Sequence, residues 1–104
     1  MNVHAIVKTG FQIGMVQIET EAMQLAAFLA ALRPHHVMEI GTDRGGLFYV
    51  LTQLAQGTKV SLDLPGGPWG SIPFEKIEER DNMIRSWSQD AVLIRADSHS
   101  EESA

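Results

Sequence analysis

Apolar residues recur at helical intervals over residues 20–32. They form two stripes, the first made of Leu25, Phe28, Leu29 and Leu32 and the second of Met23, Ala26, Ala27 and Ala30. A helix with two apolar faces is expected to be covered on both sides. Pro34 ends the predicted helix, because the residue before a proline is driven out of the helical region.

Three short apolar runs follow, at 36–40, 59–64 and 91–95, and their length favours buried strands. Between these three runs, apolar residues recur at helical intervals and predict two helices. The first helix covers 47–54 and is closed by Gly57, and the second covers 74–87.

The second of these helices follows an evident loop, 65–70, which is rich in proline and glycine. Ser71 is its expected N-cap, and Pro73 suits the first turn. After the last strand, Ser98 and Glu101 have the spacing of a capping box that would open a further helix.

The start of the chain has a different pattern. Val3, Ala5 and Val7 alternate with the residues between them, which fits a short strand with Gly10 and Gly14 as breakers, and an N-terminal arm stays open as the alternative. We therefore divide the chain into an N-terminal arm or short strand over 1–18 and one domain over 19–104.

Strands that alternate with helices indicate parallel βαβ units. The predicted fold class is α/β. It is a partial Rossmann-like doubly wound sheet of about three parallel strands with flanking helices, and its C-terminal half is expected to be missing.

Composition excludes several classes of protein. The chain has 104 residues, no cysteine and a formal net charge of -5, so disulfides and thiolate metal sites are absent. No apolar run approaches the roughly 20 residues of a membrane span, and no signal peptide is recognisable. Arg80 and Arg85 lie among acidic residues and indicate a solvated helix face, so we expect no binding to nucleic acid or membrane. A cytoplasmic location follows as the expectation.

The turn after the first predicted strand carries the candidate chemistry. It reads Glu39-Ile40-Gly41-Thr42-Asp43-Arg44-Gly45-Gly46. Gly41 permits a sharp turn and a close approach to a ligand, while Gly45 and Gly46 open a helix whose free N–H groups would face that ligand. The G-x-G-x-x-G fingerprint for a pyrophosphate is absent. An acid at position 39 suits a ligand with a cationic end.

This E-x-G-x-x-x-G turn, together with Asp63 and Asp97 at the next two strand ends, resembles class I S-adenosylmethionine-dependent methyltransferases. The similarity is to the small-molecule O-methyltransferase branch, also called cephalosporin hydroxylase-like, and it extends over about 19–102. The resemblance implies cofactor-binding roles for Glu39, Gly41, Thr42, Gly45, Asp63, Asp97 and Ser98. Glu39 would shape the amino-acid end of the pocket, Asp63 would hold the ribose and Asp97 would lie near the adenine amino group.

Structural interpretations stay open beside these roles. Glu39 could have a structural partner, Asp63 could cap a loop, and Asp97 could cap the helix that Ser98 begins. Trp69 fits either an adenine ring or the edge of the sheet, and we favour the latter.

The histidines give no catalytic or metal assignment. His35 and His36 point to opposite faces of a strand, so joint ligation of a metal is not expected. His99, close to Asp97, fits either a catalytic base or a surface residue, and we favour the surface residue. No catalytic base can be named, and the acidic cluster that binds a divalent metal in the family resembled would lie in the missing half.

Three functions follow in order of preference. The first is an S-adenosylmethionine-binding methyltransferase-like domain, truncated and of doubtful activity. The second is a non-catalytic oligomeric scaffold, and the third is a nicotinamide-dependent oxidoreductase. The strand at 37–40 would be an exposed edge, so we expect a homo-oligomer through it. A small-molecule substrate is expected for the first function only.

Overall fold

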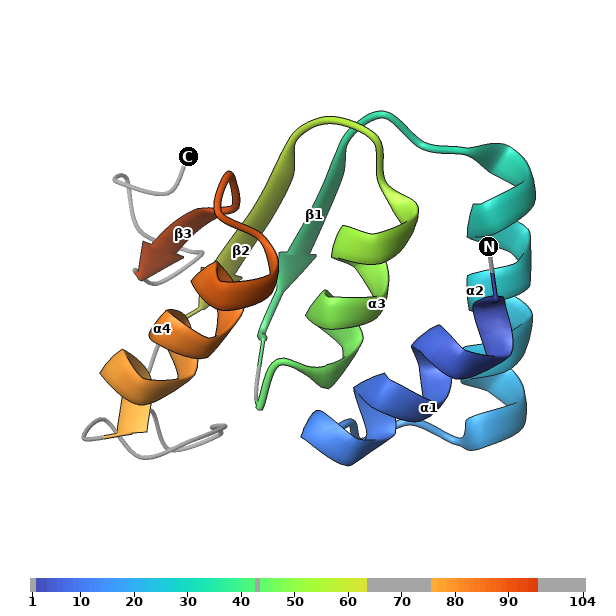
Figure 1. The fold of residues 1–104 in the computed structure, drawn as a ribbon, viewed down its shortest axis with the longest axis horizontal. Coiled ribbons are helices and arrows are strands. Elements are labelled where there is room, and N and C mark those ends of the chain that lie inside the picture. The colour runs from blue at the N-terminus through green and yellow to red at the C-terminus, as the bar shows by residue number, and fades with distance from the viewer. Residues whose placement is uncertain (1, 43, 64–75, 96–104) are drawn as a thin grey trace.

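The computed structural model describes residues 2–42, 44–63 and 76–95. Its helices and strands are, in order, α1 (Val3–Ile13), α2 (Glu19–Leu32), β1 (Val37–Ile40), α3 (Gly46–Leu54), β2 (Lys59–Asp63), α4 (Ile77–Trp87) and β3 (Val92–Arg95). The strands form one parallel sheet in the order β1-β2-β3 (Figure 1). This confirms an α/β arrangement with three parallel strands, consistent with a partial Rossmann-like fold. The predicted loop at 65–70, the Ser71 cap and the Ser98–Glu101 capping box lie outside the described residues.

The register of the strands assigns residues to the two faces of the sheet. Glu39 aligns with Ser61, which aligns with Leu93, so these three side chains share one face. Met38 aligns with Val60, and their side chains share the other face. The C-terminal end of the first face is therefore rich in polar groups, while the second face is apolar.

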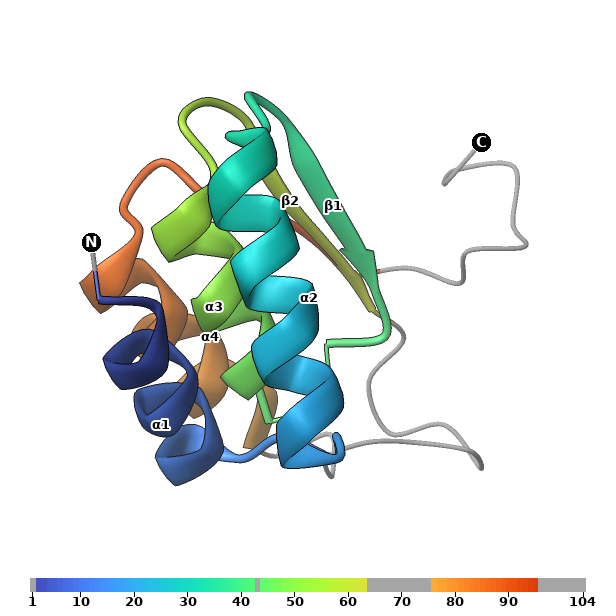
Figure 2. The same ribbon diagram turned by 90° about the vertical axis from the view of Figure 1, so that its right-hand side faces the viewer.

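The helices lie on the polar face. In Figure 1, α4 lies over β2 and β3, α3 lies beside β1, and α1 and α2 extend the layer beyond α3. Figure 2 shows the same layer from its α2 side. No described helix covers the apolar face, where Met38 is 55% and Ile40 65% exposed. Within the described ranges, no helix has both the length and the apolar character needed to cross a membrane.

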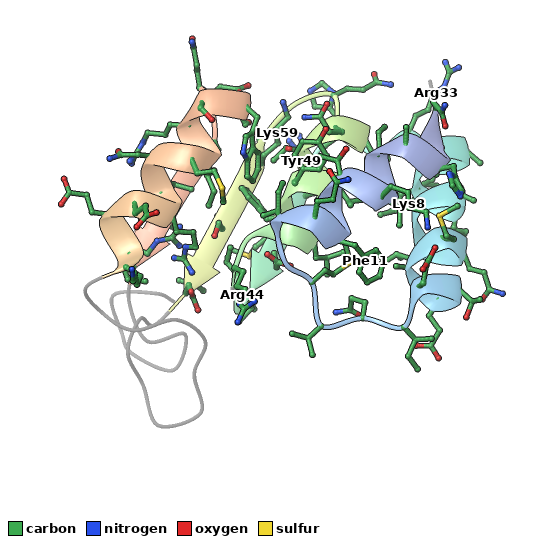
Figure 3. All side chains as sticks on the ribbon, turned by 60° about the horizontal axis from the view of Figure 1, so that its bottom comes forward. Lys8, Phe11, Arg33, Arg44, Tyr49 and Lys59 are labelled. Carbon is green, nitrogen blue, oxygen red and sulfur yellow. The ribbon has the colours of Figure 1, made fainter. Side chains whose placement is uncertain are left out.

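The segment predicted as a strand at the N-terminus is the helix α1, so that prediction is wrong. Asn2 caps it by accepting a hydrogen bond from the Ala5 N–H at 3.0 Å. Val7 is completely buried in the core that α1 shares with α2 and α3, and Ile6 packs against this core. Phe11, labelled in Figure 3, also packs against it. The strand prediction treated Ile6 as an outward position, whereas Ile6, Val7 and Phe11 belong to one helical stripe.

Two glycines allow α1 and α3 to approach closely. A Cβ on Gly10 would lie 2.8 Å from the Gly46 carbonyl oxygen, and a Cβ on Gly46 would overlap the carbonyl oxygens of Gly10 and Gly14. The α1 backbone therefore lies directly against the first turn of α3. Gly10 serves this packing in the middle of a helix and does not break it.

The expectation that α2 is covered on both sides is also wrong. Ala22 and Ala26 are buried against the other helices, whereas Leu25, Phe28 and Leu32 are exposed. Ala22 and Ala26 let neighbouring helices come close, and Leu29 packs partly buried against the same core, whereas the other three large residues of the predicted stripe are left outside. At the N-terminus of α2, Lys8 donates a hydrogen bond to Glu19 at 2.8 Å and lowers the pKa of that carboxyl.

Candidate functional site

The turn between β1 and α3 lies at the carboxyl end of the sheet, where parallel α/β folds bind ligands. Gly41 has φ +84°, a conformation that glycine adopts without strain, and its N–H donates to the Leu62 carbonyl at 2.9 Å. Gly41 is exposed, and a Cβ placed on it would have no neighbour within 4 Å among the described residues. The predicted sharp turn is confirmed, and it has open space on the side where a ligand would approach.

The next residues of the turn face inward. Thr42 is 2% exposed, and its hydroxyl is hydrogen-bonded to the Ser61 hydroxyl on β2. Gly45 has φ +99° and lies under α4, where a Cβ would be 3.7 Å from the Met83 methyl carbon and 3.9 Å from the Trp87 ring. Both residues thus hold the turn against the sheet and α4.

The N–H groups of Gly45 and Gly46 have partners within the chain. Gly45 donates to the Thr42 carbonyl and Gly46 donates to the Gly14 carbonyl, both at 3.0 Å. The sequence-based expectation that these two groups are free to face a ligand is therefore wrong. For Gly46 the cause is the end of α1, which can approach the first turn of α3 because Gly46 has no side chain.

Asp63 ends β2 in a buried ion pair. Arg80 Nη1 of α4 lies 2.6 Å from Asp63 Oδ2, and the two side chains are 3% and 5% exposed. A carboxylate in this position is oriented by α4 and is shielded from water. Any contact of Asp63 with a ribose would have to be made beside the Arg80 guanidinium.

A second ion pair adjoins the first. Arg95 of β3 donates to both carboxylate oxygens of Asp81, at 2.8 and 2.9 Å, and its Nη1 donates to the Ser61 carbonyl at 3.0 Å. Arg80 Nε lies 3.3 Å from Asp81 Oδ1 and links the two pairs. We call Ser61, Asp63, Arg80, Asp81 and Arg95 the α4–sheet network.

Opposing effects act on the pKa of Asp81. Burial raises the pKa, but the hydrogen bonds and positive charges of Arg95 and Arg80 outweigh burial and hold the pKa below its ordinary value. Asp81 therefore carries its negative charge at neutral pH, as the two guanidinium groups require.

The α4–sheet network corrects the interpretation of α4. The sequence-based expectation of a solvated face at Arg80 is wrong, since Arg80 is 4% and Asp81 7% exposed. A signal for this burial is present in the sequence. Positions 80 and 81 lie three and four residues after Ile77 and four and three before Ile84, on the same stripe of the helix.

Of the other predicted site residues, Glu39 lies within the described part of the chain and Asp97 and Ser98 do not. Glu39 is 9% exposed and belongs to the helix-covered face of β1. Asp97 and Ser98 lie outside the described residues, as do Trp69 and His99.

The histidine pair that precedes β1 is at the surface. The His35 and His36 rings are packed edge-on with their centroids 4.6 Å apart, and both residues are exposed. Among the described residues, no three or more histidine or acidic side chains are grouped so that they could hold a metal ion.

The described residues define a small α/β domain with a three-stranded parallel sheet and an open glycine turn at the end of β1. Comparisons of the chain with protein-family models, with curated proteins and with solved structures find no match.

Proposed function

We propose that this chain is an S-adenosylmethionine-binding, methyltransferase-like domain whose ligand lies at the β1–α3 turn. The observation that carries the proposal is Gly41, which combines an exposed position, a φ of +84° and no described atom within 4 Å of a Cβ placed on it. A ligand can approach the backbone there, at the end of a parallel strand, where Glu39 supplies a neighbouring acid. Sequence similarity to the methyltransferase turn supports this choice of ligand.

The fit to the cofactor is good at the turn and weaker elsewhere. Gly41 would permit close contact, and Glu39 would favour the cationic end of the ligand. Asp63 would reach a ribose only alongside Arg80, which already binds its Oδ2. S-adenosylmethionine supplies an activated methyl group when bound. No described side chain is identified as a base for a methyl acceptor, so we propose binding and expect no methyl transfer by these residues.

Calorimetric titration with S-adenosylhomocysteine tests the proposal. The informative variant is Gly41→Asn, because asparagine tolerates positive φ better than other residues and its side chain would occupy the open space. We expect saturable binding by the wild type and at least about ten-fold weaker binding by the variant, a change of about 1.4 kcal/mol. Gln56→Asn, at the opposite end of α3, adds no group near the turn and should bind as the wild type does.

Asp63→Ala would be a poor test of binding. It would remove one carboxylate from a buried guanidinium that Asp63 and Asp81 both contact, so loss of binding would follow from damage to the fold. Absence of saturable binding by the folded wild type would contradict the proposed function directly.

The second candidate is a non-catalytic oligomeric scaffold. It is favoured by the internal pairing of Asp63 with Arg80 and by the hydrogen bond from the Gly46 N–H to Gly14, since both use groups that a cofactor would require. A folded chain that binds neither S-adenosylhomocysteine nor NAD would support the scaffold. Binding of NAD alone would instead favour the nicotinamide-dependent oxidoreductase.

The edge of β1 offers one site for oligomerisation. Val37 donates to the Thr58 carbonyl and Gly41 to the Leu62 carbonyl. In a parallel ladder the alternate residues, Met38 and Ile40, therefore direct their N–H and C=O groups away from β2. Pairing of this edge with another chain would use these groups, as the scaffold requires.

A further inference from the structure

The outer side of α2 carries a continuous apolar stripe, which we call the α2 stripe. Its four members are exposed by 63% (Ile18), 43% (Leu25), 63% (Phe28) and 61% (Leu32). Their spacing of seven, three and four residues keeps them on one side of the helix. Figure 2 shows α2 at the front of the helical layer, with α1 beside it and α3 behind it. The stripe thus lies on a side of α2 that neither helix covers.

The area of the α2 stripe suits a dimer interface. An exposed side chain of this size offers on the order of 100 Å² of apolar surface, so the four together offer about 400 Å² per chain. Two copies would bury about 800 Å² of apolar area. Because apolar atoms make up roughly 60% of an interface, the total would be about 1,300 Å², within the range of stable specific interfaces.

Charges at the two ends of α2 specify how two copies would be oriented. Glu21 lies on the stripe in the first turn, and Arg33 follows the stripe at the C-terminal end of the helix. In an antiparallel pair centred between Leu25 and Phe28, Glu21 of each copy lies beside Arg33 of the other. The helix dipoles are also opposed in this arrangement, whereas a parallel pair would bring like charges together.

We propose that the α2 stripe is an interface between two copies of this chain, packed antiparallel about a two-fold axis near the middle of α2. An isologous interface of this kind needs a self-complementary surface. The uncharged stripe, with an acid at one end and a base at the other, is such a surface. The proposal is independent of the ligand at the β1–α3 turn and of pairing along the β1 edge.

Mass in solution tests the proposal, measured by sedimentation of the full chain over a concentration series. We expect the wild type to form a dimer. Phe28→Glu, which removes a central apolar contact and keeps a good helix former, should raise the dimer dissociation constant about 30-fold or more. Val16→Glu is the matched control, because Val16 is 85% exposed and lies outside the stripe. It should leave the dimer intact, and far-UV circular dichroism should be the same for all three proteins.

A charge exchange tests the antiparallel orientation. Glu21→Lys and Arg33→Glu should each weaken the dimer, and the double variant should recover most of the affinity. Recovery of affinity in the double variant supports the antiparallel pair, because it requires residue 21 of one copy to contact residue 33 of the other. Two independent losses without recovery would overturn that orientation.

Three results would overturn the α2 interface. One is a wild-type chain that stays monomeric at every concentration, which would leave the stripe for a different partner or none. Another is a dimer that Phe28→Glu does not weaken. The third is a dimer broken by Met38→Lys and unaffected by Phe28→Glu, which would assign the interface to the β1 edge.

Discussion

Arg80 Nη1 lies 2.6 Å from Asp63 Oδ2, and this ion pair joins α4 to the end of β2 in a nearly water-free position. Removal of Arg80 would leave the buried Asp63 carboxylate without this cation, and removal of Asp63 would take one of the carboxylates from the buried Arg80, which Asp81 also contacts. Substitution of one partner alone should therefore destabilise the fold strongly. Replacement of both partners by apolar residues should cost much less, because it removes both charges of the pair.

We expect Arg80→Met to lower the free energy of unfolding by about 3–5 kcal/mol, because Asp63 then has lost its cation. The double variant Asp63→Leu/Arg80→Met should recover a large part of this loss, since it removes both charges and keeps apolar volume. Urea denaturation followed by circular dichroism measures both values. Equal stability of the wild type and Arg80→Met would show that the pair is absent in solution.

The second prediction concerns the pH dependence of stability. The folded-state pKa of Asp81 is lowered, so its charge stabilises the fold at pH values above its unfolded pKa of about 3.9. That contribution is lost as the pH falls through the folded pKa. The stability difference between the wild type and Asp81→Asn should therefore be full at pH 7 and should shrink as the pH is lowered below about 4.

Glu19→Gln is the control for this series. The pKa of Glu19 is also lowered, by its hydrogen bond from Lys8, but its ion pair is half exposed and solvent screens it. Its difference from the wild type should stay small at every pH. An Asp81→Asn difference that grows below pH 4 would contradict the network.

Gly46→Ala tests the close contact of α1 with α3. Its Cβ would overlap the carbonyl oxygens of Gly10 and Gly14, which are backbone atoms and cannot move independently. We expect destabilisation of about 1–3 kcal/mol, as for an overpacked core, despite the better helix propensity of alanine. Thermal unfolding compared with Gln53→Ala in the same helix provides the measurement and its control. A gain in stability for Gly46→Ala would mean that α1 does not pack against this turn.

Val7→Ala tests whether α1 is part of the core. Val7 is completely buried among residues of α2 and α3, so its truncation leaves a cavity. We expect a loss of about 1–3 kcal/mol in the free energy of unfolding, whereas Ala5→Ser on the exposed side of the same helix should cost little. Equal effects of the two substitutions would exclude the observed packing of α1.

Much of the backbone could be predicted because its signals are local. The periodicity of 20–32 and the following proline predict a helix that the structure has at Glu19–Leu32. The apolar run that stops at Gly41 becomes β1, and the glycine has the positive φ that a sharp turn requires. Such features depend on residues only a few positions apart.

The locations of two apolar surfaces could not be predicted in this way. Alternation over 3–7 fits a strand when taken alone, but Ile6 and Val7 become part of a helix because their stripe finds a partner in α2 and α3. In α2, both stripes are apolar. Which of them is buried depends on the close approach of the neighbouring helices, which the alanines permit.

The burial of the charged residues in the candidate site could not be predicted from local sequence either. The local neighbours of Arg80 suggest a solvated helix face, yet its partner is Asp63, 17 residues away, and the partner of Asp81 is Arg95, 14 residues away. The sequence by itself determined the order of helices and strands from α2 to β3 and the sharp turn at Gly41. Only the tertiary structure decided which charges are buried and which N–H groups are occupied, because those properties depend on contacts between residues that the folded chain brings together.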